Sequence, residues 1–329
     1  QKSASYYTPE VLTRSTIKYT IKVIVDEVRE GKRKPMDLLD LKILEPAVGA
    51  AAFLNEVINQ LAEAYMTYVE KKPAPDRYRD ELQKVKAYIA THNVYGVDLN
   101  PTAIELGKLS LWLNVIHKDM ETPFFANRLT VGNAVIGAWL KVYARGEVQA
   151  KKGSRKLEAN EWWTKAPHKV KFGRTRVNRS VNEVYHFLLP DKAMLAALGL
   201  KDMKKEHATE AKVMADRLKD WTAPIGEDQF RTLQRLSAKI DLLLREAMET
   251  QVNIEHLTNN RRDIWPHEIP QDNMLFRAYD QAEKYAEKER IFDTRYRHDN
   301  AYYKLKLVMD YWCALWFWEY QDAAALPTR

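Results

Sequence analysis

The chain has 329 residues, of which 46% are hydrophobic and 11% aromatic, so it can form a sizeable core and is not intrinsically disordered. The net charge of +7 suits a polyanionic partner, and the single cysteine, Cys313, excludes an internal disulfide and indicates a reducing compartment. No stretch approaches the about 18 apolar residues of a membrane span, and QKSASYYTPE contains no apolar signal region. We therefore expect a cytoplasmic protein with no membrane partner.

Strand and helix patterns alternate in the first 140 residues. Thr8 as N-cap and Pro9 in the first turn predict a helix start, and one apolar face follows at helical spacing, formed by Val11, Ile17, Ile21, Ile24 and Val28. Next come a strand at LKILEP, a helix over residues 50–72, a helix over 77–90, a strand at NVYGVDL, a helix over 101–113 and a strand within RLTVGNAVIG. This order predicts a doubly wound α/β domain with a parallel sheet.

After residue 140 the strand signals fade, and from about Asp191 the pattern is mainly helical. Residues 151–179 are basic: only Glu158 and Glu161 oppose Lys151, Lys152, Arg155, Lys156, Lys165, Lys169, Lys171, Arg174, Arg176 and Arg179. We therefore predict a domain over 1–140, a basic linker over 141–180 and a helical insertion or second domain over 181–329.

The turn LEPAVGAAAFL follows the first predicted strand, where open parallel sheets bind ligands. Gly49 is its only glycine, so it is not the G-x-G-x-x-G turn that cradles a dinucleotide pyrophosphate. Glu45 adds a carboxylate at the strand end, and Asp98 ends the next strand, where an acidic residue accepts hydrogen bonds from ribose hydroxyls. Taken alone, Gly49 could belong to a purely structural turn, and Asp98 could cap the following helix. Taken together, in this order and spacing, the two residues favour a nucleoside-binding site.

Four segments in this order resemble the γ-type N6-adenine DNA methyltransferases, in particular the large Eco57I-like and phage-defence (BREX and DISARM) enzymes. YYTPEVLT resembles their motif X, EPAVGAAAFL their motif I (D-P-A-C-G-S-G-x-F-L), VYGVDLNPTAIELGKLSLWL their motif II and LTVGNAVIG their motif III. The matches cover residues 6 to 138. The resemblance implies a class I, Rossmann-like methyltransferase fold, S-adenosylmethionine as cofactor, double-stranded DNA and other defence-system subunits as partners, and a prokaryotic cytoplasmic location.

The resemblance also implies which residues contact the cofactor. Tyr7 and Thr8 would lie near its methionine end, Glu45, Ala47 and Gly49 would line the amino-acid and sulfonium region, Asp98 would bind the ribose hydroxyls, Leu99 would pack on the adenine, and Asn133 would lie near the adenine amino group. Two positions depart from the family pattern. Glu45 replaces the commoner aspartate, and Ala51 replaces a motif glycine, so both put cofactor affinity in question.

The catalytic motif IV of that family, [DNS]-P-P-[YFW], does not occur in this sequence, which contains no Pro-Pro pair. In that family, the polar side chain and the aromatic ring of motif IV hold an adenine that has been taken out of the duplex. We therefore assign no catalytic residue and interpret the chain as the N-terminal cofactor-binding part of a site-specific adenine-N6 methyltransferase, inactive alone. A non-catalytic DNA-recognition or cofactor-binding module is the alternative, whereas an NAD-dependent oxidoreductase should carry further glycines.

Other features have structural alternatives. The basic stretch could contact DNA phosphates or form a solvated loop, and Trp162 and Trp163 are expected to anchor it. A second aromatic cluster at helical spacing is expected in a core or an interface: Trp312, Trp316, Phe317 and Trp318. The eight histidines and one cysteine show no metal-ligand spacing, so we predict no metal site.

Overall fold

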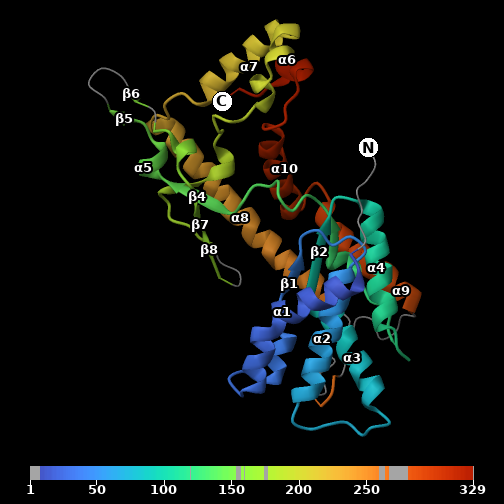
Figure 1. Cartoon of the computed structure of the whole chain (residues 1–329). Helices are drawn as coiled ribbons and strands as arrows, with labels where there is room; N and C mark the ends of the chain where they lie inside the picture. The colour runs from blue at the N-terminus through green and yellow to red at the C-terminus, as the bar shows by residue number, and fades with distance from the viewer. Residues whose placement is uncertain are drawn as a thin grey trace. The chain divides into compact units, whose positions relative to one another are not determined.

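The computed structural model describes residues 8–118, 120–152, 157–158, 160–173, 177–258, 264–266 and 281–328, and Figure 1 labels its helices and strands. The chain divides into two compact units. Unit 1 combines residues 1–135 with 253–294, and unit 2 combines 136–252 with 295–329. These bounds differ from the expected ones at 140 and 180. Residues 253–294 return to unit 1 because Ile254 and Phe292 bury their side chains with Phe124.

A parallel three-stranded sheet lies in unit 1. Its strands are β1 (Ile43–Glu45), β2 (Val94–Asp98) and β3 (Leu129–Val131), in the order β1-β2-β3. Glu45 pairs with Gly96, and Asp98 pairs with Val131. The predicted parallel α/β arrangement is therefore confirmed for these strands, and their carboxyl ends lie at one edge.

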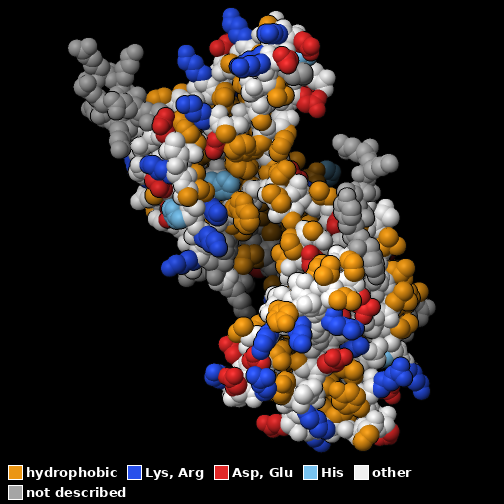
Figure 2. Space-filling model, viewed as in Figure 1, with side chains coloured by type: hydrophobic (Ala, Val, Ile, Leu, Met, Phe, Trp, Pro, Cys, Tyr) orange, Lys and Arg blue, Asp and Glu red, His pale blue; other side chains and the backbone are white. Residues whose placement is uncertain are grey.

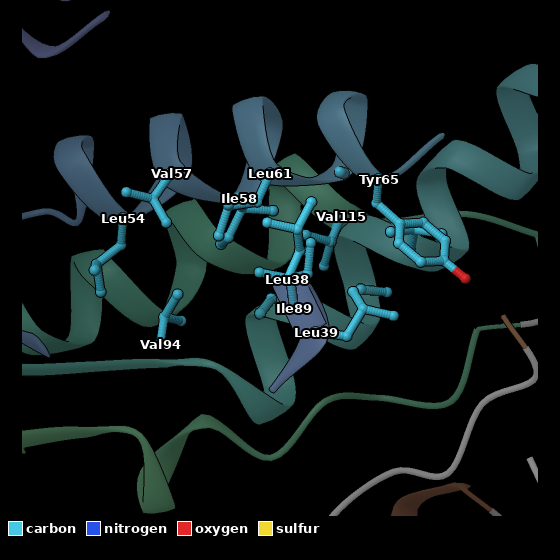
Figure 3. Close-up of a cluster of buried hydrophobic side chains, with 14 of the residues drawn as sticks. Leu38, Leu39, Leu54, Val57, Ile58, Leu61, Tyr65, Ile89, Val94 and Val115 are labelled. Carbon is cyan, nitrogen blue, oxygen red and sulfur yellow. The ribbon is translucent and has the colours of Figure 1, made fainter. Parts of the chain in front are cut away.

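The helices that the structure describes wholly within unit 1 are α1 (Glu10–Arg29), α2 (Ala52–Tyr68), α3 (Tyr78–His92), α4 (Pro101–Val115) and α9 (Gln281–Asp293). Two 3₁₀ turns, Pro35–Leu39 and Phe125–Asn127, precede β1 and β3. Helix α2 packs against α1, α3 and α4. Its apolar positions lie three and four residues apart and are fully buried, as Figure 3 shows for Leu54, Val57, Ile58, Leu61 and Tyr65.

The start of α1 differs from the prediction. Pro9, not Thr8, is the N-cap residue, and no side chain caps the helix. The Pro9 carbonyl accepts hydrogen bonds from the backbone N–H groups of Leu12 and Thr13, so the helix begins at Glu10. Val11, predicted on the buried face, is 78% exposed because it lies in this first turn, whereas Ile17, Ile21 and Val28 are buried.

Unit 2 contains strands where a linker was expected. An antiparallel sheet has the order β10-β4-β7, formed by Glu183–Tyr185, Lys141–Ala144 and His168–Lys169. Two-residue strands form two further pairs: β5 (Lys151–Lys152) with β6 (Leu157–Glu158), and β8 (Lys171–Phe172) with β9 (Val177–Asn178). Val142 and Val184 are fully buried, so this sheet contributes to the unit's core.

The rest of unit 2 is mainly helical, as predicted. Its helices are α5 (Arg145–Val148), α6 (Lys201–Glu206), α7 (Ala208–Trp221), α8 (Glu227–Thr258, whose residues from Asn253 belong to unit 1) and α10 (Ala301–Ala314). The 3₁₀ turns are Trp162–Thr164, His186–Leu188, Ala196–Gly199 and Tyr320–Ala325, and Thr294–Tyr296 lies at the boundary between the units. Across the ranges that the structure describes, no helix is long and apolar enough to cross a membrane.

The tryptophans of unit 2 follow the expectations only in part. Trp162 anchors its segment as predicted, since it is 1% exposed and its indole N–H donates to the Pro190 carbonyl at 2.8 Å. The helical spacing expected for Trp312, Trp316, Phe317 and Trp318 is wrong, because α10 ends at Ala314. Trp312, Trp316 and Trp318 pack on a cluster around Trp221, whereas Phe317 is 62% exposed.

Candidate functional site

The turn between β1 and α2 has an unusual backbone. Gly49 has φ of 51° and Ala51 has φ of 65°, both in the left-handed region that favours glycine. Ala51 is fully buried, and its N–H donates to the Val48 carbonyl at 2.8 Å. A non-glycine residue in this conformation costs about 1–2 kcal/mol. The surrounding packing therefore keeps Ala51 in a left-handed conformation, at the position where the family that the sequence resembles has glycine.

The carboxylate of Asp98 joins this turn to the end of β2. Oδ2 accepts a hydrogen bond from the Gly49 N–H at 2.8 Å, and Oδ1 accepts one from the Asn100 N–H at 2.8 Å. A carboxylate has about four lone-pair sites, so two remain after these bonds. Gly49 and Asp98, predicted to act together, are therefore in direct contact, and Asp98 can still accept two hydroxyl groups.

Two glycines that the sequence analysis did not select allow the turn to approach the sheet. A Cβ atom on Gly96 in β2 would lie 2.7 Å from Val48 Cγ2 and 2.8 Å from Leu129 Cδ2. A Cβ atom on Gly107 in α4 would lie 3.2 Å from the Gly49 carbonyl oxygen. A glycine inside a strand pattern often marks such a close backbone approach, so Gly96 in NVYGVD carried a usable signal.

Among the residues that the structure describes, none fills the space beside Gly49. A Cβ atom on Gly49 would meet none of their heavy atoms within 4 Å. Ala47 lies two residues before Gly49, and Leu99 follows Asp98, which bonds the Gly49 N–H. Both side chains are exposed, Leu99 by 68%. The turn therefore leaves room beside its backbone and presents apolar surface where a ring could pack.

Glu45 lies at the carboxyl end of β1 and is partly buried. Burial raises the pKa of its carboxyl group, and a hydrogen bond from the Ala47 backbone N–H partly offsets this effect. A cationic group beside Glu45 would favour the charged carboxylate. The expectation that Glu45 lines the amino-acid region of a cofactor stays a prediction.

The end of β3 lies beside the end of β2. The Gly132 N–H donates to the Asp98 carbonyl at 2.9 Å, which places Asn133 next to this junction. Asn133 is exposed, and its Oδ1 accepts a hydrogen bond from the Val135 N–H at 2.8 Å. Six candidate residues thus lie at the carboxyl ends of the three parallel strands or on the turns that follow them: Glu45, Ala47, Gly49, Asp98, Leu99 and Asn133.

The two motif X residues precede α1. Tyr7 lies outside the described residues, and Thr8 is a partly buried residue just before α1. Among the described parts of the chain, no cluster of three or more His, Cys, Asp or Glu side chains could hold a metal ion.

The basic stretch divides into exposed and buried cations. Lys165, Lys169 and Lys171 are exposed, so they remain candidates for contact with phosphates. Arg179 is different, because its side chain is 4% exposed and pairs with Asp241 at 2.6 Å. Arg155, Lys156, Arg174 and Arg176 lie outside the described residues, and the side chains of Lys151 and Lys152 are not described.

Comparison with known proteins gives one informative relative. A protein of Methanocaldococcus jannaschii, named as a proposed type II restriction enzyme and methyltransferase, is 30% identical over 179 residues. The alignment covers 41% of this chain and 15% of that protein, so the chain spans a small part of its relative. No protein-family model and no solved structure matches the chain. The similarity supports a restriction–modification methyltransferase and no narrower class.

Proposed function

We propose that this chain is the cofactor-binding part of a site-specific DNA adenine-N6 methyltransferase that uses S-adenosylmethionine and belongs to a restriction–modification or phage-defence system. The observation that carries the proposal is the junction of Asp98 with the Gly49 turn, beside open space. The order of the four motif-like segments and the similarity to the M. jannaschii protein support the same assignment.

The residues at this edge fit the chemistry of S-adenosylmethionine. Asp98 would accept hydrogen bonds from the ribose hydroxyls with the lone pairs that its two backbone bonds leave. Glu45 would pair with the ammonium group, Leu99 would pack on the adenine, and Asn133 would bond its amino group. Gly49 and Ala47 would line the region of the sulfonium, and Tyr7 and Thr8 would approach the methionine end. When bound, the cofactor supplies an activated methyl group.

Methyl transfer needs groups that this sequence does not contain. The [DNS]-P-P-[YFW] tetrapeptide, which would hold and polarise the adenine amino group, is absent. In the described part of the sheet, β1 pairs with β2 alone, so its other edge can pair with a further strand. Orientation and polarisation supply most of such rate accelerations, so we expect the chain alone to be inactive.

Two binding experiments and one activity experiment test the proposal. Calorimetry should show that the chain binds S-adenosylmethionine and does not bind NAD, which the oxidoreductase alternative requires. Tritiated S-adenosylmethionine and mixed-sequence duplex DNA should then be incubated with the chain and with the complete gene product. We expect label on adenine N6 with the complete product only. Binding of NAD in preference to S-adenosylmethionine would contradict the proposal.

The second candidate function is a non-catalytic DNA-recognition or cofactor-binding module, with double-stranded DNA and other defence-system subunits as its partners. The missing tetrapeptide favours it. A complete gene product that binds S-adenosylmethionine, lacks an Asn-Pro-Pro-aromatic sequence and transfers no label would support this candidate over the enzyme.

A further inference from the structure

Unit 2 contains a cavity of about 540 Å³ that the proposed methyltransferase chemistry does not use. The start of α8, the end of α10, the end of α7, residues 187–190 and residues 327–328 line it. Its deepest side chains are nearly inaccessible, since Phe187, Leu189, Trp221 and Ile225 are each 3% exposed. The apolar side chains that Figure 2 shows over α10 belong to the same unit. Cavities of this size, apolar with a few polar groups, are typical of small-ligand sites.

Four aromatic side chains line the cavity: Phe187, Trp221, Tyr311 and Trp312. Both indole N–H groups are already used, because Trp221 Nε1 donates to the Pro327 carbonyl at 3.0 Å and Trp312 Nε1 donates to the Leu189 carbonyl at 2.9 Å. These bonds fix the two rings. The cavity therefore offers ring faces and edges for stacking, and its indoles offer no hydrogen-bond donor.

Three polar lining residues lie on one exposed face of α8: Asp228, Gln229 and Thr232. Thr328 also lines the cavity, and Asp228 is the only charged residue among the lining residues that the structure describes. Gln229 Oε1 accepts a bond from the Gly226 N–H, and Thr232 Oγ1 donates to the Asp228 carbonyl. Arg235 contacts Thr232 Oγ1 at 3.1 Å and is not among these lining residues. The described rim therefore presents a carboxylate to a ligand and no side-chain cation for an anionic ligand.

We propose that this cavity binds a planar aromatic compound without negative charge, which stacks against the more accessible rings of Tyr311 and Trp312 and directs a hydrogen-bond donor toward Asp228. Phosphate- or sulfonate-bearing compounds fit poorly, because no lysine, arginine or histidine is among the described lining residues. The described lining residues all belong to unit 2, whereas the turn at Gly49 belongs to unit 1.

The test uses N-phenyl-1-naphthylamine, an uncharged aromatic amine whose fluorescence rises in apolar surroundings. Leu236 lines the rim and is 40% exposed, so Leu236→Arg should place a charge at the entrance without unfolding the unit. Leu242→Arg is the matched control, because Leu242 lies on the same helix, is 55% exposed and does not line the cavity. Thermal melts of all proteins confirm folding.

We expect saturable binding by the unchanged chain, at least about tenfold weaker binding by Leu236→Arg and little change for Leu242→Arg, a tenfold change being about 1.4 kcal/mol. A second probe, 8-anilinonaphthalene-1-sulfonate, carries the same aromatic amine with an added anion. It should bind more weakly than the neutral probe, and Asp228→Asn should narrow that difference. No saturable binding, equal binding by Leu236→Arg, or equal affinity for both probes would overturn the proposal.

Discussion

Asp98 accepts a hydrogen bond from the backbone N–H of Gly49 at 2.8 Å, so one carboxylate connects the end of β2 to the turn that precedes α2. The same carboxylate accepts the Asn100 N–H. Asp98 therefore has a structural role whether or not a ligand is bound. Substitutions at this position change both the turn and any ribose contact, and an experiment on Asp98 must separate the two effects.

The strained conformation of Ala51 predicts an unusual response to glycine. Ala51→Gly removes a buried methyl group worth about 0.8 kcal/mol but relieves about 1–2 kcal/mol of left-handed strain. We expect the free energy of unfolding to change by less than about 1 kcal/mol, after the extra freedom of the unfolded chain is included.

Ala62→Gly is the control for Ala51→Gly. Ala62 is equally buried but lies inside α2. It should lose about 2 kcal/mol, from the methyl group and from helix propensity. Urea denaturation measures both variants, and equal losses would mean that Ala51 is not strained.

The close approach at Gly96 predicts a steric cost. Gly96→Ala would place Cβ 2.7 Å from Val48 Cγ2 and 2.8 Å from Leu129 Cδ2. Overpacking of this kind costs about 1–3 kcal/mol. Gly146→Ala is the control, because a Cβ atom there would meet nothing within 4 Å. Urea denaturation should show a clear loss for Gly96→Ala alone, and a tolerated Gly96→Ala would contradict the described packing of the turn on the sheet.

The local patterns of the sequence predicted unit 1 well. Apolar runs such as LKILEP and NVYGVDL, separated by amphipathic helices, correspond to β1 and β2, and the candidate residues Gly49 and Asp98 are in contact. These features depend on short-range periodicity and on the rule that ligands bind at strand ends.

Other features could not be predicted in the same way. The strands of unit 2 within residues 141–178 are two to four residues long, too short to show an alternating pattern. The return of residues 253–294 to unit 1 depends on contacts far apart in sequence, such as Asn127 Nδ2 to Thr258 Oγ1 at 3.0 Å and Tyr65 Oη to the Trp265 carbonyl at 2.7 Å. A contact between two such residues, far apart in the sequence, produces no periodic pattern of hydrophobic residues.

The ion pair between the buried Arg179 and the partly buried Asp241 predicts a large loss of stability when the aspartate is removed. Arg179 Nη2 lies 2.6 Å from Asp241 Oδ2, and the Tyr185 hydroxyl donates to Asp241 Oδ1 at 2.8 Å. Asp241→Ala should cost about 3–5 kcal/mol, because the buried guanidinium loses its counter-charge.

The control for Asp241→Ala is Asp310→Ala, which breaks the exposed ion pair with Lys306. It should cost at most about 1 kcal/mol. Chemical denaturation monitored by tryptophan fluorescence compares the two, and similar small losses would contradict the importance of the buried pair.

His186 predicts a loss of stability in acid. Burial lowers its pKa to about 4 from the ordinary 6.5, and its Nε2 accepts the Trp139 N–H at 2.9 Å. Between pH 6.5 and 4 the unfolded chain binds a proton that the folded chain does not, so stability falls as the pH falls, by up to about 3 kcal/mol.

The variant His186→Gln keeps an acceptor without a titrating ring. Its stability, measured by urea denaturation from pH 7 to 4, should fall less steeply than that of the unchanged chain. The same pH dependence in both proteins would exclude His186 as the source.

The central claim, that the Asp98 turn binds S-adenosylmethionine through its ribose, is tested most directly by a calorimetric cycle. S-adenosylmethionine and its 2′-deoxyribose analogue are titrated into the unchanged chain and into Asp98→Asn, with Asp37→Asn as a control for a carboxylate that bonds backbone elsewhere in unit 1. We predict that Asp98→Asn weakens binding of S-adenosylmethionine by about 10- to 100-fold, that it weakens the deoxy analogue much less, and that Asp37→Asn changes neither affinity. No binding by the unchanged chain, or equal weakening of both ligands by Asp98→Asn, would contradict the claim.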